Sequence, residues 1–255
     1  MISPSWSDSL EDYLRHSNED DRTIDAFTSE VLPALRTTRE LSWAEIGPGP
    51  CTKTRKLLAL MSPITSLAEV TLLEPHGAWD ERLLDFKRDV CPRVNVLRRD
   101  LRYLVPETPS AEPFLVTCIH VLYDASAVVR FIDALSRLGK TRARFIAFIV
   151  LESPDSMFVK TRCALAEIGS SVPIAAGDML ASRLIRAGLP LKTRRVDDKF
   201  FNMSWLPPES REGWLASFLY GMHRELTAAE AAIIDNAAQR DIWEVPDMCY
   251  TVDCL

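Results

Sequence analysis

Three short apolar segments of the sequence end in residue types that together suit a nucleoside. Gly47 and Gly49 follow "LSWAEI", Glu74 ends "VTLLE", and Asp100 ends "VNVLRRD". Glycine lets a ligand approach the backbone, one carboxylate accepts both hydrogen bonds of a ribose diol, and a second can reach an adenine amino group. We therefore expect a nucleoside pocket at these strand ends. Its predicted residues are Glu45, Gly47, Gly49, Glu74, Pro75, Asp100, Leu101, Ile119 and His120.

The glycine turn differs from the turn that binds dinucleotides. The dinucleotide fingerprint is G-x-G-x-x-G, whereas Thr52 stands three residues after Gly49. Glu45 would repel a pyrophosphate, but it suits a cationic sulfonium amino acid, whose ammonium group strand-end acids can hold. The sequence also lacks a G-x-x-x-x-G-K-[ST] loop, which disfavours ATP chemistry.

The segment "EIGPGPC" resembles the E/D-x-G-x-G-x-G motif of class I S-adenosylmethionine-dependent methyltransferases. Cys51 stands at the place of the last glycine and is likewise small. Acids after the second and third strands also match that superfamily. The resemblance implies S-adenosyl-L-methionine as the cofactor.

The N-terminal stretch "WSDSLEDYLRHSNEDDRTIDAFTSEVLPAL" resembles that of the histamine N-methyltransferase family, which has an aromatic-rich helix, a His-Ser-x-Glu segment and a helix ending in Leu-Pro. The segments "CIHVLYD" and "GWLASFL" and the last strand match in order and spacing, so the resemblance covers nearly the whole chain. It implies that Glu19 binds the substrate, with Trp6 and Leu10 beside it. His120 stands where the family has a glutamine, and Asp247 at or near its asparagine. These two departures argue against histamine itself as the substrate.

His120 lies near the end of the apolar run "FLVTCIHVLY". A histidine with an ordinary pKa of ~6.5 is largely neutral at pH 7 and can accept a proton. Asp247 would orient this imidazole or bind the substrate. The alternatives are a structural histidine, a loop acid at Asp247, and at Glu19 an acid that only complements a helix start. The predicted catalytic residues are His120, Glu19 and Asp247, and the predicted substrate-binding residues are Trp6, Leu10, Tyr13, Glu19, Tyr123 and Asp247.

We expect methyl transfer by direct in-line displacement, with an amine or nitrogen heterocycle as the acceptor. Glu19 would position the acceptor, and His120 would take its proton. An alternative is methylation at carbon or oxygen of an indole or other aromatic natural product, which a histidine in place of the family's glutamine favours. A further alternative is a non-catalytic, methyltransferase-like regulatory protein, which would be expected to have degraded cofactor motifs. A Rossmann dehydrogenase is a fourth alternative, against which Glu45 and the missing third glycine argue.

Short apolar runs alternate with amphipathic segments along the chain, which predicts βαβ units and an α/β fold with a doubly wound, mostly parallel sheet. The N-terminal stretch to Leu35 is predicted to be helical, with Ser17 and Asp20 forming a capping box. We expect one methyltransferase domain over 1–255, with a helical substrate cap from about 1–37 and 153–225. The predicted strands are 41–47, 70–75, 94–100, 114–123, 143–152, 191–200 and 248–255. The predicted helices are 52–61, 79–90, 126–138, 155–168, 178–187, 210–220 and 227–240.

Composition narrows the class of protein. The 255 residues are 47% apolar and 26% charged with a net charge of −6, as in an ordinary soluble protein without a basic surface for nucleic acid. We also expect no membrane span and no secretory signal. The six cysteines form no C-x-x-C pair and do not cluster with the four histidines, so we expect no metal site, a buried free thiol at Cys118, and a reducing cytoplasm. The expected partner is a small-molecule substrate, for a monomer or homodimer.

Overall fold

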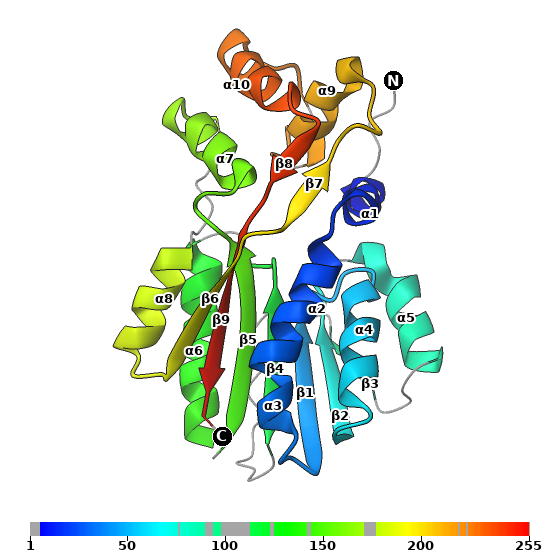
Figure 1. The fold of residues 1–255 in the computed structure, drawn as a ribbon, viewed down its shortest axis with the longest axis vertical. Coiled ribbons are helices and arrows are strands. Elements are labelled where there is room, and N and C mark those ends of the chain that lie inside the picture. Colours follow the sequence, from blue (N-terminus) through cyan, green and yellow to red (C-terminus); the bar gives the residue numbers. More distant parts are fainter. Residues whose placement is uncertain are drawn as a thin grey trace.

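The main sheet, with helices on both sides, makes up the lower half of the molecule in Figure 1. The computed structural model describes residues 6–75, 77–89, 94–97, 113–122, 125–141, 144–170, 177–218, 220–222 and 224–254. Seven strands form one sheet, in the order β3 (Val94–Leu97), β2 (Ser66–Leu73), β1 (Glu40–Ile46), β4 (Phe114–Ile119), β5 (Phe145–Glu152), β9 (Asp247–Asp253) and β6 (Leu191–Val196). The first five are parallel, and β9 runs antiparallel to both β5 and β6. The strand order reverses between β1 and β4, which is where ligands bind in open α/β sheets.

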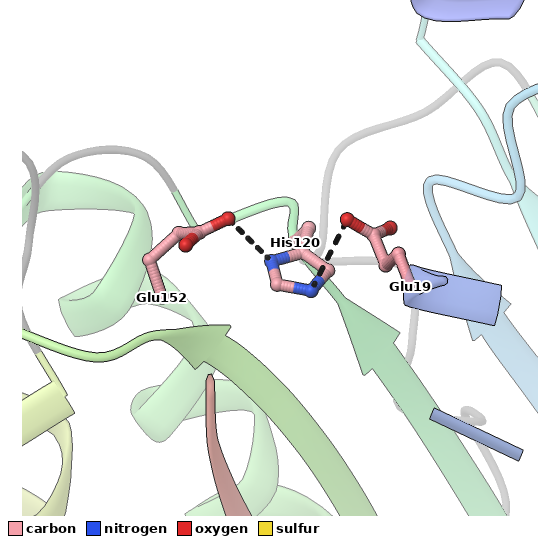
Figure 2. Close-up of side chains that lie close together, drawn as sticks. All are labelled: Glu19, His120 and Glu152. Atoms are coloured by element: carbon pink, nitrogen blue, oxygen red, sulfur yellow. Dashed lines mark ion pairs between the residues drawn. The ribbon is translucent and has the colours of Figure 1, made fainter. Parts of the chain in front are cut away.

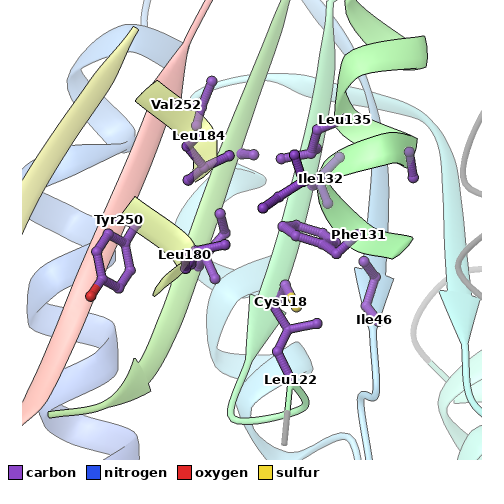
Figure 3. Packing of buried hydrophobic residues seen from close by; sticks show 14 of the residues in the cluster. Ile46, Cys118, Leu122, Phe131, Ile132, Leu135, Leu180, Leu184, Tyr250 and Val252 are labelled. Carbon is purple, nitrogen blue, oxygen red and sulfur yellow. The ribbon is translucent and has the colours of Figure 1, made fainter. Parts of the chain in front are cut away.

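Helices cover both faces of this sheet, which is why β4 and β5 are apolar along almost their whole length. One face packs against α2 (Glu19–Glu30), α3 (Leu32–Leu35), α4 (Thr52–Met61) and α5 (Asp80–Asp89). The other packs against α6 (Ala125–Thr141) and α8 (Gly177–Arg186), whose apolar side chains meet those of β1, β4 and β9 in Figure 3. The predicted α/β class with a mostly parallel sheet is confirmed.

A second group of elements, here called the upper group, lies beyond the carboxyl ends of the parallel strands (Figure 1). It consists of α1 (Trp6–His16), α7 (Met157–Glu167), α9 (Pro208–Phe218), α10 (Ala228–Ala238) and the two-stranded sheet of β7 (Phe200–Asn202) and β8 (Ile242–Glu244). These elements share an apolar core rich in aromatic rings. The predicted cap ranges contain elements of both layers, since α2, α3 and α8 pack on the sheet whereas α1, α7 and α9 belong to the upper group. The upper group also includes α10 and β8, which lie outside those ranges.

Two local predictions near the N-terminus and in the 191–200 segment are wrong. Ser17 does not cap α2, because it pairs with Phe201 in an antiparallel bridge and Asn18 precedes the helix instead. The single strand predicted over 191–200 is two strands, β6 and β7, which belong to different sheets. The break at 197–199 carries the chain from the main sheet to the upper group and leaves Lys199 between the two.

Several predicted boundaries agree with the structure, and others differ by a few residues. α4 spans the predicted 52–61, and a 3-10 turn at Gly77–Trp79 precedes α5. β4 ends at Ile119, earlier than the predicted 123. β8 was not predicted at all. The segment "PETPSAEP" at 106–113, whose composition predicts a surface loop, lies outside the described residues except for Pro113.

Cys118 is fully buried and not in a disulfide, as predicted, and burial raises the pKa of its thiol well above the usual value. None of the helices that the structure describes has both the length and the apolar character needed to cross a bilayer.

Candidate functional site

The glycine turn after β1 repeatedly adopts the left-handed backbone conformation. The φ angles are 64° at Gly47, 54° at Gly49 and 61° at Cys51. Glycine adopts this conformation at little cost, whereas other residues are strained there. Cys51 therefore keeps the backbone conformation that a glycine would favour at the last position of the turn, although it carries a side chain.

Gly47 also allows a close approach between two strand ends. A Cβ atom added at Gly47 would lie 2.2 Å from Cγ1 of Val121, in the segment that follows β4. No side chain fits at that distance, so only glycine lets the turn after β1 lie directly against the residues after β4. The two sides of the switch point are thereby held in contact.

Two buried carboxyl groups accompany the turn. The backbone N–H of Gly49 donates a hydrogen bond to Oε2 of Glu74, at 3.2 Å. Glu45, near the end of β1, is only 4% exposed, and its Oε2 has no hydrogen-bond partner among the described residues. Burial raises the pKa of Glu45 from 4.5 to about 7. One oxygen of this carboxyl group therefore lacks a hydrogen-bond partner in the described part of the chain, and a cationic ligand could satisfy it.

A cluster of charged side chains, here called the Lys199 cluster, lies at the same edge of the sheet. Its members are Glu19 at the start of α2, Lys53 in α4, His120 after β4, Glu152 at the end of β5, Lys199 before β7 and Asp247 at the start of β9. Glu152 and Asp247 are paired residues of neighbouring strands. Two like charges at such a position repel each other unless a cation lies between them.

Lys199 supplies that cation. It is 1% exposed, and its Nζ lies 2.8 Å from Asp247 Oδ1 and 3.3 Å from Glu152 Oε1. A third carboxylate oxygen, Glu19 Oε2, is also 3.3 Å away. Burial by itself would lower the pKa of Lys199, but Asp247, Glu152 and Glu19 raise it well above the usual value. The buried ammonium therefore keeps its proton and joins the upper group to the sheet.

His120 lies in the middle of the cluster. Its Nε2 is 3.1 Å from Asp247 Oδ2 and 3.4 Å from Lys199 Nζ, and its Nδ1 is 3.6 Å from Glu152 Oε1. Figure 2 shows the ring between Glu152 and Glu19. The backbone of His120 is left-handed, with φ 54°, while its N–H still bonds to the carbonyl of Val150 on β5. This strained position directly after the strand turns the ring toward the acids of other elements.

Glu19 is held from three directions. The Tyr13 hydroxyl donates to Oε2 at 2.7 Å, Lys199 approaches the same oxygen, and Lys53 forms an ion pair with Oε1. Burial raises the pKa of Glu19, but His120, Lys53 and Lys199 outweigh it and hold this pKa well below its usual value. Burial and the Glu19 carboxylate raise the pKa of Tyr13 well above its usual value, so the phenol remains a donor. Glu19 is therefore an ionised carboxylate with cations on both oxygens.

The donor set has the composition of a metal site but already contains a cation. Ligand atoms of Glu19, His120 and Glu152 lie within 4.8 Å of one another. The ammonium of Lys199 lies within 3.4 Å of a ligating atom of each. A divalent ion would have to displace or approach this buried charge, so these residues do not fit a metal.

The structure brings together three distant residues that the sequence nominated, namely Glu19, His120 and Asp247. Tyr13 joins them through its hydroxyl, and Leu10 lies where the sheet core meets the aromatic core of the upper group. Ile119 is buried at the end of β4 and Pro75 is exposed after β2. Trp6 begins α1, but nothing about its side chain is described. Asp100, Leu101 and Tyr123 lie outside the described residues.

Sequence reasoning missed Lys199, Glu152 and Lys53. Glu152 has the same signal as Glu74, since it is an acid that ends a buried strand. Lys199 stands in "VDDKF", where nothing distinguishes it from a solvated surface lysine. Lys53 is one of several cations in α4, and only the packing of α2 against α4 brings it to Glu19.

No protein-family model matches the chain. No curated protein matches it either. Solved structures do resemble it. A SAM-dependent methyltransferase from Archaeoglobus fulgidus has a TM-score of 0.50 at 11% identity, over 92% of this chain and 94% of that one. A cyclopropane-fatty-acyl-phospholipid synthase-like protein from Lactobacillus casei has a TM-score of 0.56 at 11% identity, over 92% and 90%.

A third similar structure is the [4+2]-cyclase SpnF, with a TM-score of 0.50 at 12% identity, over 88% of this chain and 79% of that one. At such identities the likeness shows the fold, which is the Rossmann-like fold of SAM-dependent methyltransferases. Since a cyclase is among these structures, the reaction of this chain has to be argued from its own site.

Proposed function

We propose that this protein transfers the methyl group of S-adenosyl-L-methionine to a small-molecule acceptor. The observation that carries the proposal is the turn after β1, where Glu74 accepts the N–H of Gly49 and Cys51 keeps a glycine-like backbone. The turn lies beside the point where the strand order reverses, and the fold is that of SAM-dependent methyltransferases.

The residues at this turn fit the cofactor. Glu74 would accept the hydrogen bonds of the ribose diol, and the backbone of Gly47 and Gly49 would allow a ligand to lie close. Glu45 offers a buried oxygen without a partner among the described residues, which suits the ammonium of the amino-acid part. S-adenosylmethionine supplies a methyl group made electrophilic by its sulfonium.

His120 and Asp247 would handle the proton of the acceptor. Asp247 Oδ2 lies 3.1 Å from Nε2. In the tautomer that carries its proton on Nε2, Asp247 would accept this N–H, and the lone pair on Nδ1 would be the base. When Nδ1 takes a proton, Asp247 and Glu152 balance the charge of the imidazolium. The upper group would exclude water from the reacting atoms.

The sequence resemblance to histamine N-methyltransferases favours an amine or nitrogen heterocycle as the acceptor. The second candidate is attack through carbon or oxygen of an indole or another aromatic ring. The pairing of His120 with Asp247 favours this candidate, because a ring N–H or O–H must lose its proton to become a strong nucleophile.

Calorimetric titration with S-adenosylhomocysteine tests the proposal, with NADH as the competing ligand. We expect micromolar binding of S-adenosylhomocysteine alone, weakened at least tenfold in Glu74→Ala because a charge-assisted hydrogen bond contributes about 1.5–3 kcal/mol. Glu69→Ala on the same strand is the control, since Glu69 is exposed. Binding of NADH instead, or no binding of either, would refute the proposal. Binding without turnover on amine, indole and phenol panels would favour the non-catalytic alternative.

A further inference from the structure

We infer that Lys199 occupies the position that the charged group of an amine substrate would take, so that the acceptor is an uncharged molecule. This inference rests on the proposed function and narrows its substrate class. It concerns the Lys199 cluster, and its evidence is the contacts, the charges and the aromatic side chains of that cluster.

The carboxylates expected to hold an amine are already engaged. Oε1 of Glu19 pairs with Lys53, and its Oε2 contacts Tyr13 at 2.7 Å and Lys199 at 3.3 Å. Oδ1 of Asp247 contacts Lys199 at 2.8 Å, and its Oδ2 lies 3.1 Å from His120. All four oxygens of these two acids therefore have a partner. An incoming ammonium would have to displace one of these partners.

The cations that these acids need come from the chain itself. Lys53 pairs with Glu19, and the Lys199 ammonium lies within 3.3 Å of an oxygen of Glu19, of Glu152 and of Asp247. A second ammonium in this buried site would be desolvated beside the first, with no anion of the cluster left that lacks a cation.

Glu152 offers the remaining polar contact. Its Oε2 is buried and has no hydrogen-bond partner in the described part of the chain. A carboxyl group in this state pairs well with an N–H or O–H of a neutral molecule. Unlike Glu45, Glu152 already has a cation, since its Oε1 lies 3.3 Å from Lys199. An uncharged N–H or O–H group therefore suits the open oxygen, whereas a second positive charge would face Lys199.

Aromatic side chains adjoin the cluster on the side of the upper group. The Tyr13 ring, whose hydroxyl reaches Glu19, lies 5.0 Å from the ring of Phe201, 5.7 Å from Phe158 and 5.9 Å from Phe218. These rings pack against one another in the buried core of the upper group, so the cluster is bordered on this side by apolar side chains. Apolar surroundings without a further anion disfavour a free amine as the acceptor.

Methylammonium chloride tests whether Lys199 fills a cation site, since it mimics the end of the lysine side chain. Melting temperatures are compared with those in sodium chloride at equal ionic strength for wild type, Lys199→Ala and the exposed control Lys192→Ala. We expect methylammonium to stabilise Lys199→Ala in a saturable manner and to leave the other two unchanged. Equal stabilisation of the wild type would overturn the inference, because the cluster would then accept an external cation beside Lys199. If Lys199→Ala does not fold, Lys199→Gln takes its place.

Matched pairs of ligands test the acceptor class directly. Wild-type protein saturated with S-adenosylhomocysteine is titrated with 3-methylindole against tryptamine, and with p-cresol against tyramine. We expect the uncharged member of a pair to bind at least tenfold more tightly. Tighter binding of the amine, or no binding of either uncharged ligand, would contradict the inference. Failure of the proposed function is a separate result, namely no binding of S-adenosylhomocysteine, and it does not affect the methylammonium experiment.

Discussion

The glycine turn and the Lys199 cluster lie at the same edge of one sheet, but the buried acids of the two regions differ in their partners. Glu45 at the turn is buried with one oxygen that has no partner among the described residues. Glu19 in the cluster is equally buried but contacts two lysines and a tyrosine. The first acid has an elevated pKa and the second a depressed one, although burial acts on both in the same direction.

The difference shows that burial alone does not identify a binding carboxylate. Burial raises the pKa of an acid, and neighbouring cations and hydrogen-bond donors counteract that change. An acid whose partner is missing is ready for a cationic ligand, whereas an acid with internal partners is part of the structure around the ligand. The predictions below test this contrast, beginning with the largest expected effect.

Lys199→Met should reduce the free energy of unfolding by about 3–5 kcal/mol, because it leaves buried carboxylates without their cation. The deficit should shrink as the pH falls, since protonation removes the uncompensated charges. Chemical denaturation at several pH values measures it, with the exposed Lys192→Met as the control. A loss below about 1 kcal/mol would mean that Lys199 is not needed to compensate the charge of the buried acids.

Glu45→Gln should raise stability at neutral pH and above. Between pH 4.5 and about pH 7, Glu45 keeps its proton in the folded protein, whereas the unfolded chain has released it. Stability therefore falls as the pH rises through this window, by up to about 3 kcal/mol in total. The free energy of unfolding of the variant should exceed that of wild type by about this amount near pH 8 and equal it near pH 4. Chemical denaturation at both pH values measures the difference.

The same group should couple ligand binding to proton release. An ammonium placed beside Glu45 favours its ionised form, so S-adenosylhomocysteine should expel a proton near pH 6 and bind more tightly as the pH rises toward 7. Titration calorimetry in buffers of different ionisation enthalpy detects the proton. Release that persists in Glu45→Gln would assign it to another group.

Gly47→Ala should reduce the free energy of unfolding by about 1–3 kcal/mol, because the new Cβ would meet Val121 at 2.2 Å and φ is 64°. The substitution should also weaken the binding of S-adenosylhomocysteine, since the turn and the segment after β4 must move apart. Gly213→Ala within α9 is the matched control, because nothing lies within 4 Å of the added atom. The control should gain about 0.5–1 kcal/mol. Equal behaviour of the two variants would contradict the close approach.

Tyr13→Phe is expected to have the smallest effect, a loss of about 1 kcal/mol, since it removes one hydrogen bond from Glu19 and leaves both ion pairs in place. Thermal denaturation measures it. If the loss exceeds about 3 kcal/mol, the hydroxyl rather than the lysines is the main partner of Glu19.

Much of the sheet could be predicted because its signal is local. "FLVTCI" and "FIAFIVLE" are apolar along their length, since α-helices cover both faces of these strands. The 52–61 helix was predicted with its boundaries, because Pro50 and the glycines end the preceding strand. The capping box at Ser17 failed for a non-local reason, as Phe201 lies far along the chain and nothing near Ser17 indicates the pairing.

By itself, the sequence determined the alternation of strands and helices, the glycine turn, and the acids that end β1 and β2. These depend on residues that are neighbours in the chain, so their spacing is visible directly. Only the tertiary structure decided where β9 inserts, how α1 and α10 come to share the upper group, and which cation meets which acid. Lys199 meets Glu19, Glu152 and Asp247 only after three separate segments have packed around it. The physical reason is that ionic contacts between distant segments have no periodicity, and their strength depends on burial that arises only when the chain has folded.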